Sequence, residues 1–253
     1  MHDSWWAPWN ADEHFRYWPG SIPLLISLPH DGSEIPPPIA NELTDIGRSS
    51  PDSDWQVARL YDFARGLGAH VLRPRWSRYV VDLNRPPDGA ALYPGRRETG
   101  LCPTVMFDGE PVYLEGREPD ADAIAVRVDR YWRPYHTQLA TILATLRAEH
   151  GHALLWEGHS IRSLCPMFFE GRLPDYNVGT ADGASGSVPA APTGAAALAL
   201  VRHGLAPDKC DGFRGPLAPL LDALPLEAIA AVRQHQPTLA RIAERGIALL
   251  PQS

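Results

Sequence analysis

Short apolar segments alternate with longer amphipathic segments along most of this chain. The apolar segments have the length of strands, and the amphipathic segments carry apolar residues at helical spacing. Because strand–helix alternation builds sheets with covered faces, it predicts an α/β fold with a mixed, partly parallel sheet flanked by helices. The predicted strands are PLLISLPHDG (23–32), AHVLRP (69–74), SRYVVDLNRP (77–86) and HALLWEGHS (152–160), and the predicted helices are 52–67 and 121–150, the latter bent at Pro134.

The composition is that of a globular protein. With 253 residues, 44% of them hydrophobic and 21% charged, the chain has enough apolar material for a substantial core. We therefore expect a single domain over residues 1–253. Residues 1–20 carry four tryptophans without periodicity, which indicates an arm packed on the body, whereas residues 200–253 have helical spacing.

Several locations and partners are disfavoured. No apolar run approaches the ~20 residues of a membrane span, and the first ten residues, MHDSWWAPWN, lack the basic and apolar regions of a signal peptide. Three cysteines without a CxxC pair (Cys102, Cys165 and Cys210) indicate a reducing compartment, so we expect a cytoplasmic protein. The net charge of −7 argues against nucleic acid but permits a small acidic ligand in a local cationic pocket, and it leaves the oligomeric state open.

Polar residues stand where the predicted strands end. His30 follows one strand, His159 follows another, and Asn84 with Arg85 follow a third. In α/β sheets, ligands gather at the carboxyl ends of strands. The two histidines could share a metal with Asp54 at a helix start, in an arrangement that leaves a position open for a reacting water. Because the chain has 10 histidines, the pattern alone favours histidines that only form hydrogen bonds over a metal site.

Longer motifs, in unbroken order over roughly residues 20–185, make the chain resemble the N-formylglutamate deformylase family (N-formylglutamate amidohydrolases). The resemblance implies a fold similar to that of zinc carboxypeptidases, a three-layer, phosphorylase/hydrolase-like sandwich. It also implies metal-dependent hydrolysis of N-formyl-L-glutamate to L-glutamate and formate, the last step of one histidine-degradation route. The most specific motifs are SRYVVDLNRP, LYPG-x-x-x-TGLCPT and HSIRS-x-x-P-x-FFEGRLPD-x-N-x-GT.

The same resemblance implies that His30, Asp54 and His159 are the metal ligands. Two histidines and a carboxylate suit zinc among the divalent metals. The neighbouring carboxylate, Asp52, is interpreted as a residue at the start of the helix.

Guanidinium groups on the predicted strand 77–86 suit an acidic substrate. N-formylglutamate carries two carboxylates, and guanidinium groups bind carboxylates bidentately. Asn84 and Arg85 match the pair with which carboxypeptidase-like enzymes hold a substrate carboxylate. Arg78 is either a second carboxylate-binding residue or the partner of Asp82 or Asp88.

Two further residues are candidates for substrate binding. Thr99 lies in a long loop that resembles the substrate loop of the family and could line the pocket. Arg162, three residues after His159, faces either the site or the solvent. The partner that these residues predict is a small acidic molecule.

Departures from the family pattern concern the catalytic base. Glu157 stands where the family usually has an aspartate before Gly-His-Ser, and from about residue 198 the chain lacks the late strand that bears the family's glutamate. Glu157, Glu170 and Glu227 are the candidates for a substitute. We take Glu157 as the candidate catalytic residue; its alternative role is to orient His159. Two other functions stay open, namely hydrolysis of another N-acylated acidic amino acid and an inactive anion-binding homologue without a base.

Overall fold

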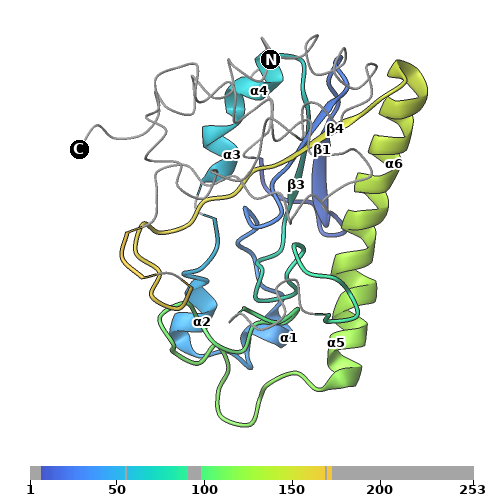
Figure 1. Ribbon diagram of the computed structural model, residues 1–253. Coiled ribbons are helices and arrows are strands. Elements are labelled where there is room, and N and C mark those ends of the chain that lie inside the picture. The colour runs from blue at the N-terminus through green and yellow to red at the C-terminus, as the bar shows by residue number, and fades with distance from the viewer. Residues whose placement is uncertain (1–6, 55, 91–97, 169, 173–253) are drawn as a thin grey trace.

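The computed structural model describes residues 7–54, 56–90, 98–168 and 170–172, and a four-stranded sheet crosses this part of the chain (Figure 1). β2 pairs in parallel with β3 and with β4, whereas β1 is antiparallel to β3. The predicted mixed, partly parallel sheet is therefore confirmed. The strands, in their order across the sheet, are β1 (Phe15–Trp18), β3 (His70–Pro74), β2 (Leu24–Ser27) and β4 (Leu154–Glu157).

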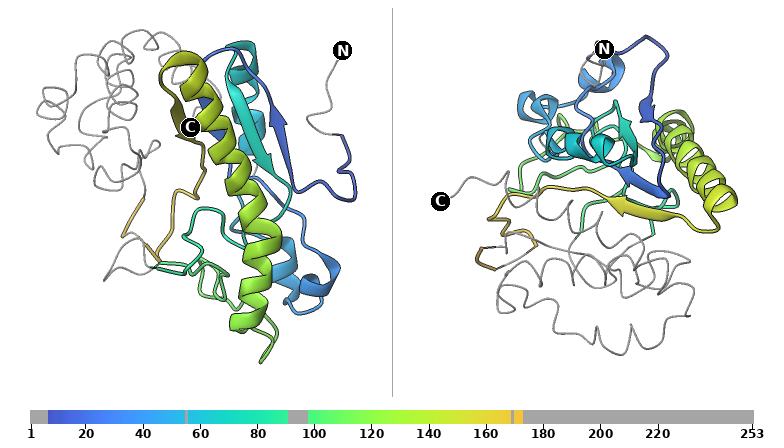
Figure 2. Two further views of the ribbon diagram at one scale, coloured as in Figure 1. Left: turned by 90° about the vertical axis from the view of Figure 1, so that its right-hand side faces the viewer. Right: turned by 90° about the horizontal axis from the view of Figure 1, so that it is seen from above.

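Helices cover both faces of the sheet, which gives three layers (Figure 2). One face is covered by two short helices, α3 (Val57–Leu60) and α4 (Asp62–Gly66). The other face is covered by a continuous helical rod made of α5 (Ala121–Arg127), the π-helical turn η1 (Val128–Trp132) and α6 (Arg133–His150). Two further short helices, α1 (Pro37–Ala40) and α2 (Asp45–Ser49), lie together at one end of the molecule.

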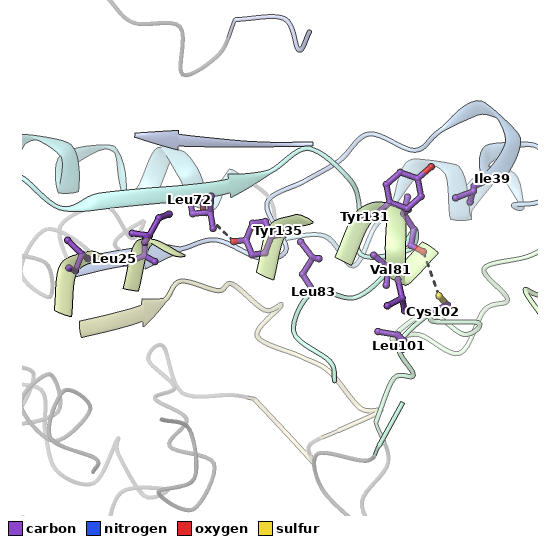
Figure 3. Packing of buried hydrophobic residues seen from close by; sticks show 13 residues of the cluster. Leu25, Ile39, Leu72, Val81, Leu83, Leu101, Cys102, Tyr131 and Tyr135 are labelled. Carbon is purple, nitrogen blue, oxygen red and sulfur yellow. Dashed lines mark hydrogen bonds between the residues drawn. The ribbon is translucent and has the colours of Figure 1, made fainter. Parts of the chain in front are cut away.

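The side chains on the two faces of β2 pack into two separate hydrophobic cores. Leu24 and Ile26 pack with α3 and α4, whereas Leu25 packs with the helical rod, as the alternation of side chains along a strand requires. Figure 3 shows the second core, where the hydroxyl of Tyr135 donates to the carbonyl oxygen of Leu72 (3.4 Å). The same hydroxyl lies 2.9 Å from Ser27 Oγ. Because both faces are covered, the first three residues of β2 are all apolar rather than alternating, and all four of its residues are buried.

Residues 77–86, predicted as a strand, do not join the sheet. Their hydrogen bonds are largely local: the amide of Val80 donates to Ser77 O (2.9 Å) and that of Arg85 to Asp82 O (3.2 Å). Val80, Val81 and Leu83 are nevertheless buried. The apolar pattern of this segment therefore predicted correctly that these residues are buried. They are buried because they pack against the helical rod, not because the segment is a strand of the sheet.

Other predicted elements differ in their bounds. The helix predicted over 52–67 begins only at Val57, because Gln56 has a positive φ of 57° that interrupts a helix, and Tyr61 separates α3 from α4. β1 lies inside the predicted arm 1–20. The helix predicted over 121–150 is confirmed, and Pro134 lies in the first turn of α6, immediately after the π turn.

Parts of the sequence analysis concern residues outside the described ranges. The predicted helical segment 200–253, Glu227 and Cys210 belong to these parts. Within the described part of the chain, no helix combines the length and the apolar character that a membrane crossing requires.

Candidate metal centre and anion-binding cluster

Three sequence-distant side chains converge at the carboxyl ends of β2 and β4. His30 follows β2, His159 follows β4, and Asp54 precedes α3, tied to the first loop by a hydrogen bond from its amide to His30 O (3.0 Å). One ligand atom from each of the three lies within 4.8 Å of the others. Parallel pairing of β2 and β4 brings the two histidines to the same edge, which is why strand-end reasoning predicted their approach.

Close backbone packing fixes both histidine-bearing loops. A Cβ atom at Gly32 would lie 2.2 Å from the carbonyl oxygen of Trp76. At Gly158, a Cβ atom would lie 2.7 Å from the side chains of Leu28 and Tyr61. Glycine therefore lets the loops after β2 and β4 pass close to their neighbours and present the histidines.

The buried carboxylate of Asp82 joins this centre, although the sequence analysis considered it only as a partner for an arginine. It accepts hydrogen bonds from His30 Nε2 (2.6 Å), Arg78 Nη2 (2.6 Å) and the amide of Asn84 (2.9 Å), and it is fully buried. Burial alone would raise the pKa of Asp82, but the neighbouring His30 and Arg78 hold it well below its usual range. Asp82 is therefore an ionised carboxylate that only accepts hydrogen bonds.

The contacts of Asp82 and Asp54 fix the proton positions on the two imidazoles. Since Asp82 accepts from His30 Nε2, that nitrogen carries the proton, and Nδ1, 3.9 Å from Asp54 Oδ2, has its lone pair free. Burial lowers the pKa of His30 despite the charge of Asp82, which keeps this imidazole neutral. For His159, desolvation opposes protonation, but the hydrogen bond from Nδ1 to Asp54 (3.0 Å) outweighs it and raises the pKa.

This donor set fits a divalent metal. It contains two imidazoles and one carboxylate, and the second carboxylate, Asp82, orients the far nitrogen of a ligating histidine, as is usual at such centres. A cation would displace the proton that His159 Nδ1 now shares with Asp54. That these residues bind a metal stays a prediction.

Arginines and a threonine form a cationic cluster beside the three predicted ligands. Arg78 pairs with Asp82, one of the two partners considered for it, and it is buried, with 5% of its surface exposed. Thr99 Oγ1 accepts from both Arg78 Nη2 and Arg85 Nη2, at 3.3 Å each. Arg85 also donates through Nε to Thr99 O (2.9 Å), and Asn84 Nδ2 lies 3.2 Å from His159 Nε2. The four candidate residues 78, 84, 85 and 99 therefore lie together, and Asn84 links them to the predicted metal ligands.

Arg162 lies at a neighbouring carboxylate rather than in this cluster. Its Nη2 donates to Asp52 Oδ1 (2.8 Å), and its side chain keeps 40% exposure. The other oxygen of Asp52 accepts from Tyr79 Oη (2.7 Å) and from the amide of Phe107 (2.9 Å). The interpretation of Asp52 as a helix-start residue is therefore wrong: it is a buried acceptor that joins three segments, and only its position close to Asp54 hinted at this.

Glu157 and Glu170, the candidate bases within the described residues, form no hydrogen bond with the cationic cluster or the predicted metal ligands. Glu157, the last residue of β4, is exposed, and the structure records no hydrogen bond between its carboxylate and another described residue. Both ring nitrogens of His159 have other neighbours, Asp54 and Asn84, so Glu157 makes no hydrogen bond to this ring, although the two groups interact electrostatically. Glu170 is also exposed. The catalytic role of Glu157 stays a prediction.

Comparison with known sequences identifies close relatives. Residues 22–211 match the family described as N-formylglutamate amidohydrolase. The chain is 49% identical over 174 residues to N-formylglutamate deformylase of Pseudomonas aeruginosa and 47% identical over 174 residues to N-formylglutamate deformylase of Pseudomonas putida. Each match covers 69% of this chain and 65% of the relative, so the chain spans just under two thirds of the relatives' length.

Comparison with solved structures agrees on the fold. The structure of an N-formylglutamate amidohydrolase from Ralstonia eutropha JMP134 superposes with a TM-score of 0.58 at 18% identity, over 94% of this chain and 99% of the other. The structure of the gene product Atu2144 from Agrobacterium tumefaciens superposes with a TM-score of 0.56 at 17% identity, over 94% of this chain and 96% of the other. At these identities the likeness supports the α/β fold alone.

Replacing Asp82 by asparagine should weaken the metal centre and the fold together. The amide keeps the shape but removes the charge that orients His30 and neutralises the buried Arg78. We expect zinc affinity, measured by competition with a chelator, to fall roughly 10–100-fold, and the free energy of unfolding in urea to fall by about 3–5 kcal/mol.

The control is Glu34→Gln, which removes a partly exposed ion pair with Arg75 (2.9 Å) outside the centre. Glu34→Gln should lower the free energy of unfolding by less than about 1 kcal/mol and leave the zinc affinity unchanged. Wild-type zinc affinity in the Asp82→Asn protein would contradict the role assigned to Asp82.

Proposed function

The chain belongs to the N-formylglutamate amidohydrolase family, and from this premise we propose that it hydrolyses N-formyl-L-glutamate to L-glutamate and formate. The observation that carries the proposal is the junction of two sites. Asn84 lies 3.2 Å from His159, so groups that suit a carboxylate adjoin groups that suit a metal. A substrate that bears a carboxylate near a hydrolysable amide fits this junction.

We propose that His30, Asp54 and His159 hold a divalent cation, zinc by its preference for this donor set. When bound, such an ion supplies Lewis acidity, which polarises a carbonyl group and makes water a better nucleophile near neutral pH. Asp82 keeps His30 in the tautomer whose Nδ1 can ligate. The protein's own contribution is thus to hold these side chains before a substrate arrives.

The carboxylates of the substrate would be bound by Asn84 and by arginines. Arg85 has a partly exposed guanidinium, whereas Arg78 is buried and already neutralised by Asp82. We therefore assign the first carboxylate to Asn84 and Arg85, with Thr99 holding the guanidinium of Arg85. Both Arg78 and Arg162 are paired with an aspartate, but Arg162, with 40% of its side chain exposed, is more accessible to a second carboxylate.

Proton transfer to the departing amine requires a donor, and of the two candidates within the described residues, Glu157 and Glu170, we assign this role to Glu157. It ends β4, two residues before His159, and its exposed carboxylate makes no hydrogen bond to another described residue but interacts electrostatically with His159. Positioned acids and bases typically contribute about 10²–10⁴ in rate. We further propose, from the family resemblance, that the reaction belongs to histidine degradation in the cytoplasm.

Formate release is the direct test of this function. The purified, zinc-loaded protein should release formate from N-formyl-L-glutamate and should lose this activity to a chelator. N-formyl-L-glutamine, which lacks one carboxylate, should react with a kcat/KM lower by roughly 10- to 100-fold, because a guanidinium loses its partner. Acetate release from N-acetyl-L-glutamate with no formate release would instead assign another acyl group. Binding without turnover of any of these compounds would indicate an inactive anion-binding homologue.

The Arg85→Ala variant tests the carboxylate site. Loss of a charge-assisted contact should lower kcat/KM for N-formyl-L-glutamate by an amount equivalent to about 2–4 kcal/mol. Zinc content should stay the same, since Arg85 is not a predicted ligand. Arg133→Ala, which removes an exposed guanidinium at the start of α6 that pairs with Asp129 of η1, should leave kcat/KM unchanged. Equal kinetics for the two variants would mean that the carboxylate binds elsewhere.

The Glu157→Gln variant tests the proposed proton donor. An amide of the same shape cannot transfer the proton, so kcat should fall by roughly 10²–10⁴ while zinc content and KM change little. The pH dependence of kcat should lose one limb in the same variant. Full activity in Glu157→Gln would assign proton transfer to a different group.

A further inference from the structure

A π-helical turn interrupts the helical rod that covers one face of the sheet. The amide of Arg133 donates to Val128 O, five residues earlier, which marks η1 (Val128–Trp132). In an α-helix each residue turns by about 100°, so residues five apart point about 140° away from each other. In a π turn such residues lie about one turn apart and face the same side. Arg127 and Trp132 therefore face the same neighbour.

That neighbour is the segment 77–86, which was predicted as a strand but does not join the sheet. Arg127 Nη1 donates to the carbonyl oxygen of Val80 (3.4 Å), and Trp132 Nε1 donates to that of Arg85 (2.9 Å). One turn further along α6, His136 Nε2 lies 2.8 Å from the carbonyl oxygen of Leu83. Side chains of the rod thus take the hydrogen-bonding places that a partner strand would have filled.

Trp132 and His136 act as one rigid unit. Their rings stack with centroids 3.7 Å apart and planes 20° apart. Because a carbonyl oxygen only accepts, the proton of neutral His136 is on Nε2. Burial lowers the pKa of His136, which favours this neutral form. The stacked pair therefore presents two fixed donors to the segment.

The two donors flank the proposed carboxylate-binding dipeptide. Leu83 O is bound by His136, Asn84 O by Arg85 Nη1 (2.8 Å), and Arg85 O by Trp132. All three consecutive carbonyl groups are bound by side chains, so the peptide planes on either side of Asn84 cannot rotate without breaking one of these bonds. The orientation of the Asn84 and Arg85 side chains depends on those planes.

We propose that Trp132 and His136 are positioning residues, which hold the Asn84–Arg85 dipeptide in the orientation that binds a substrate carboxylate. The π turn aligns Arg127 with them, so that the segment is held at three points. The inference rests on the proposed function of Asn84 and Arg85. Trp132 and His136 act only through that dipeptide, since their donors are engaged by the backbone carbonyl groups of Arg85 and of Leu83, the residue that precedes it.

Paired variants separate this role from simple packing. Trp132→Phe keeps an aromatic ring but loses the donor, and it should raise KM for N-formyl-L-glutamate roughly tenfold with kcat changed less than about twofold. His136→Leu should do the same, whereas His136→Gln, which retains a donor, should restore a KM near that of the wild type. In an Arg85→Ala background, Trp132→Phe should add little, because the group that it positions is already missing.

The matched control is Trp76→Phe, which also removes one indole hydrogen bond, to His14 Nδ1 (3.0 Å), outside the site. It should lower the melting temperature about as much as Trp132→Phe but leave KM unchanged. Equal KM values for the two variants, or an undiminished effect of Trp132→Phe in the Arg85→Ala background, would overturn the proposal.

Hydrogen exchange keeps the test independent of the reaction. The amides of Asn84 and Arg85 donate to Asp82 Oδ1 and Asp82 O, so their exchange rates report whether this turn opens. Trp132→Phe should speed their exchange at least severalfold and Trp76→Phe should not. If the wild type neither binds nor hydrolyses N-formyl-L-glutamate, the proposed function fails. The exchange comparison alone then decides whether the stacked pair holds the dipeptide.

Discussion

The buried charge of Asp82 is the interaction on which the rest of the site depends. A carboxylate with no exposed surface is tolerated only when cations and hydrogen-bond donors surround it. Asp82 meets that requirement with an imidazole, a guanidinium and a backbone amide, and each comes from a different functional part of the site. One constraint therefore fixes a predicted metal ligand, the arginine cluster and the turn that carries Asn84.

This arrangement around Asp82 is possible because residues 77–86 do not pair with the sheet. A strand at 77–86 would have paired its carbonyl groups with a neighbour, and its side chains would have alternated between two faces. In the observed turns, the carbonyl groups point to the helical rod, while the side chains of Asp82, Asn84 and Arg85 gather at the site. Apolar burial and a concentrated polar cluster thus come from the same ten residues.

Sequence reasoning was sound where one local rule governed the outcome. β2, β3, β4 and the long helix follow from apolar periodicity, and His30 and His159 meet because parallel strands end at a common edge. Sequence reasoning failed where residues distant in the sequence determine the local structure. Nothing local in SRYVVDLNRP reveals that Trp132 and His136 bind its carbonyl groups, and nothing in PDSDW reveals that Arg162 and Tyr79 converge on Asp52. Periodicity reports that a residue is buried, but not which partner buries it.

The hydrogen bond between Asp54 and His159 joins residues 105 positions apart in the chain. Closing so long a loop has an entropic cost that grows only with the logarithm of its length, about 0.6 kcal/mol for each doubling. The closure itself is carried by the pairing of β2 with β4 and by this carboxylate–imidazole contact. The exposed stretch 114–118 lies inside that loop and outside every strand and helix. Evolution could therefore lengthen or shorten it at little thermodynamic cost, and related chains could differ in size there while the two histidines keep their spacing.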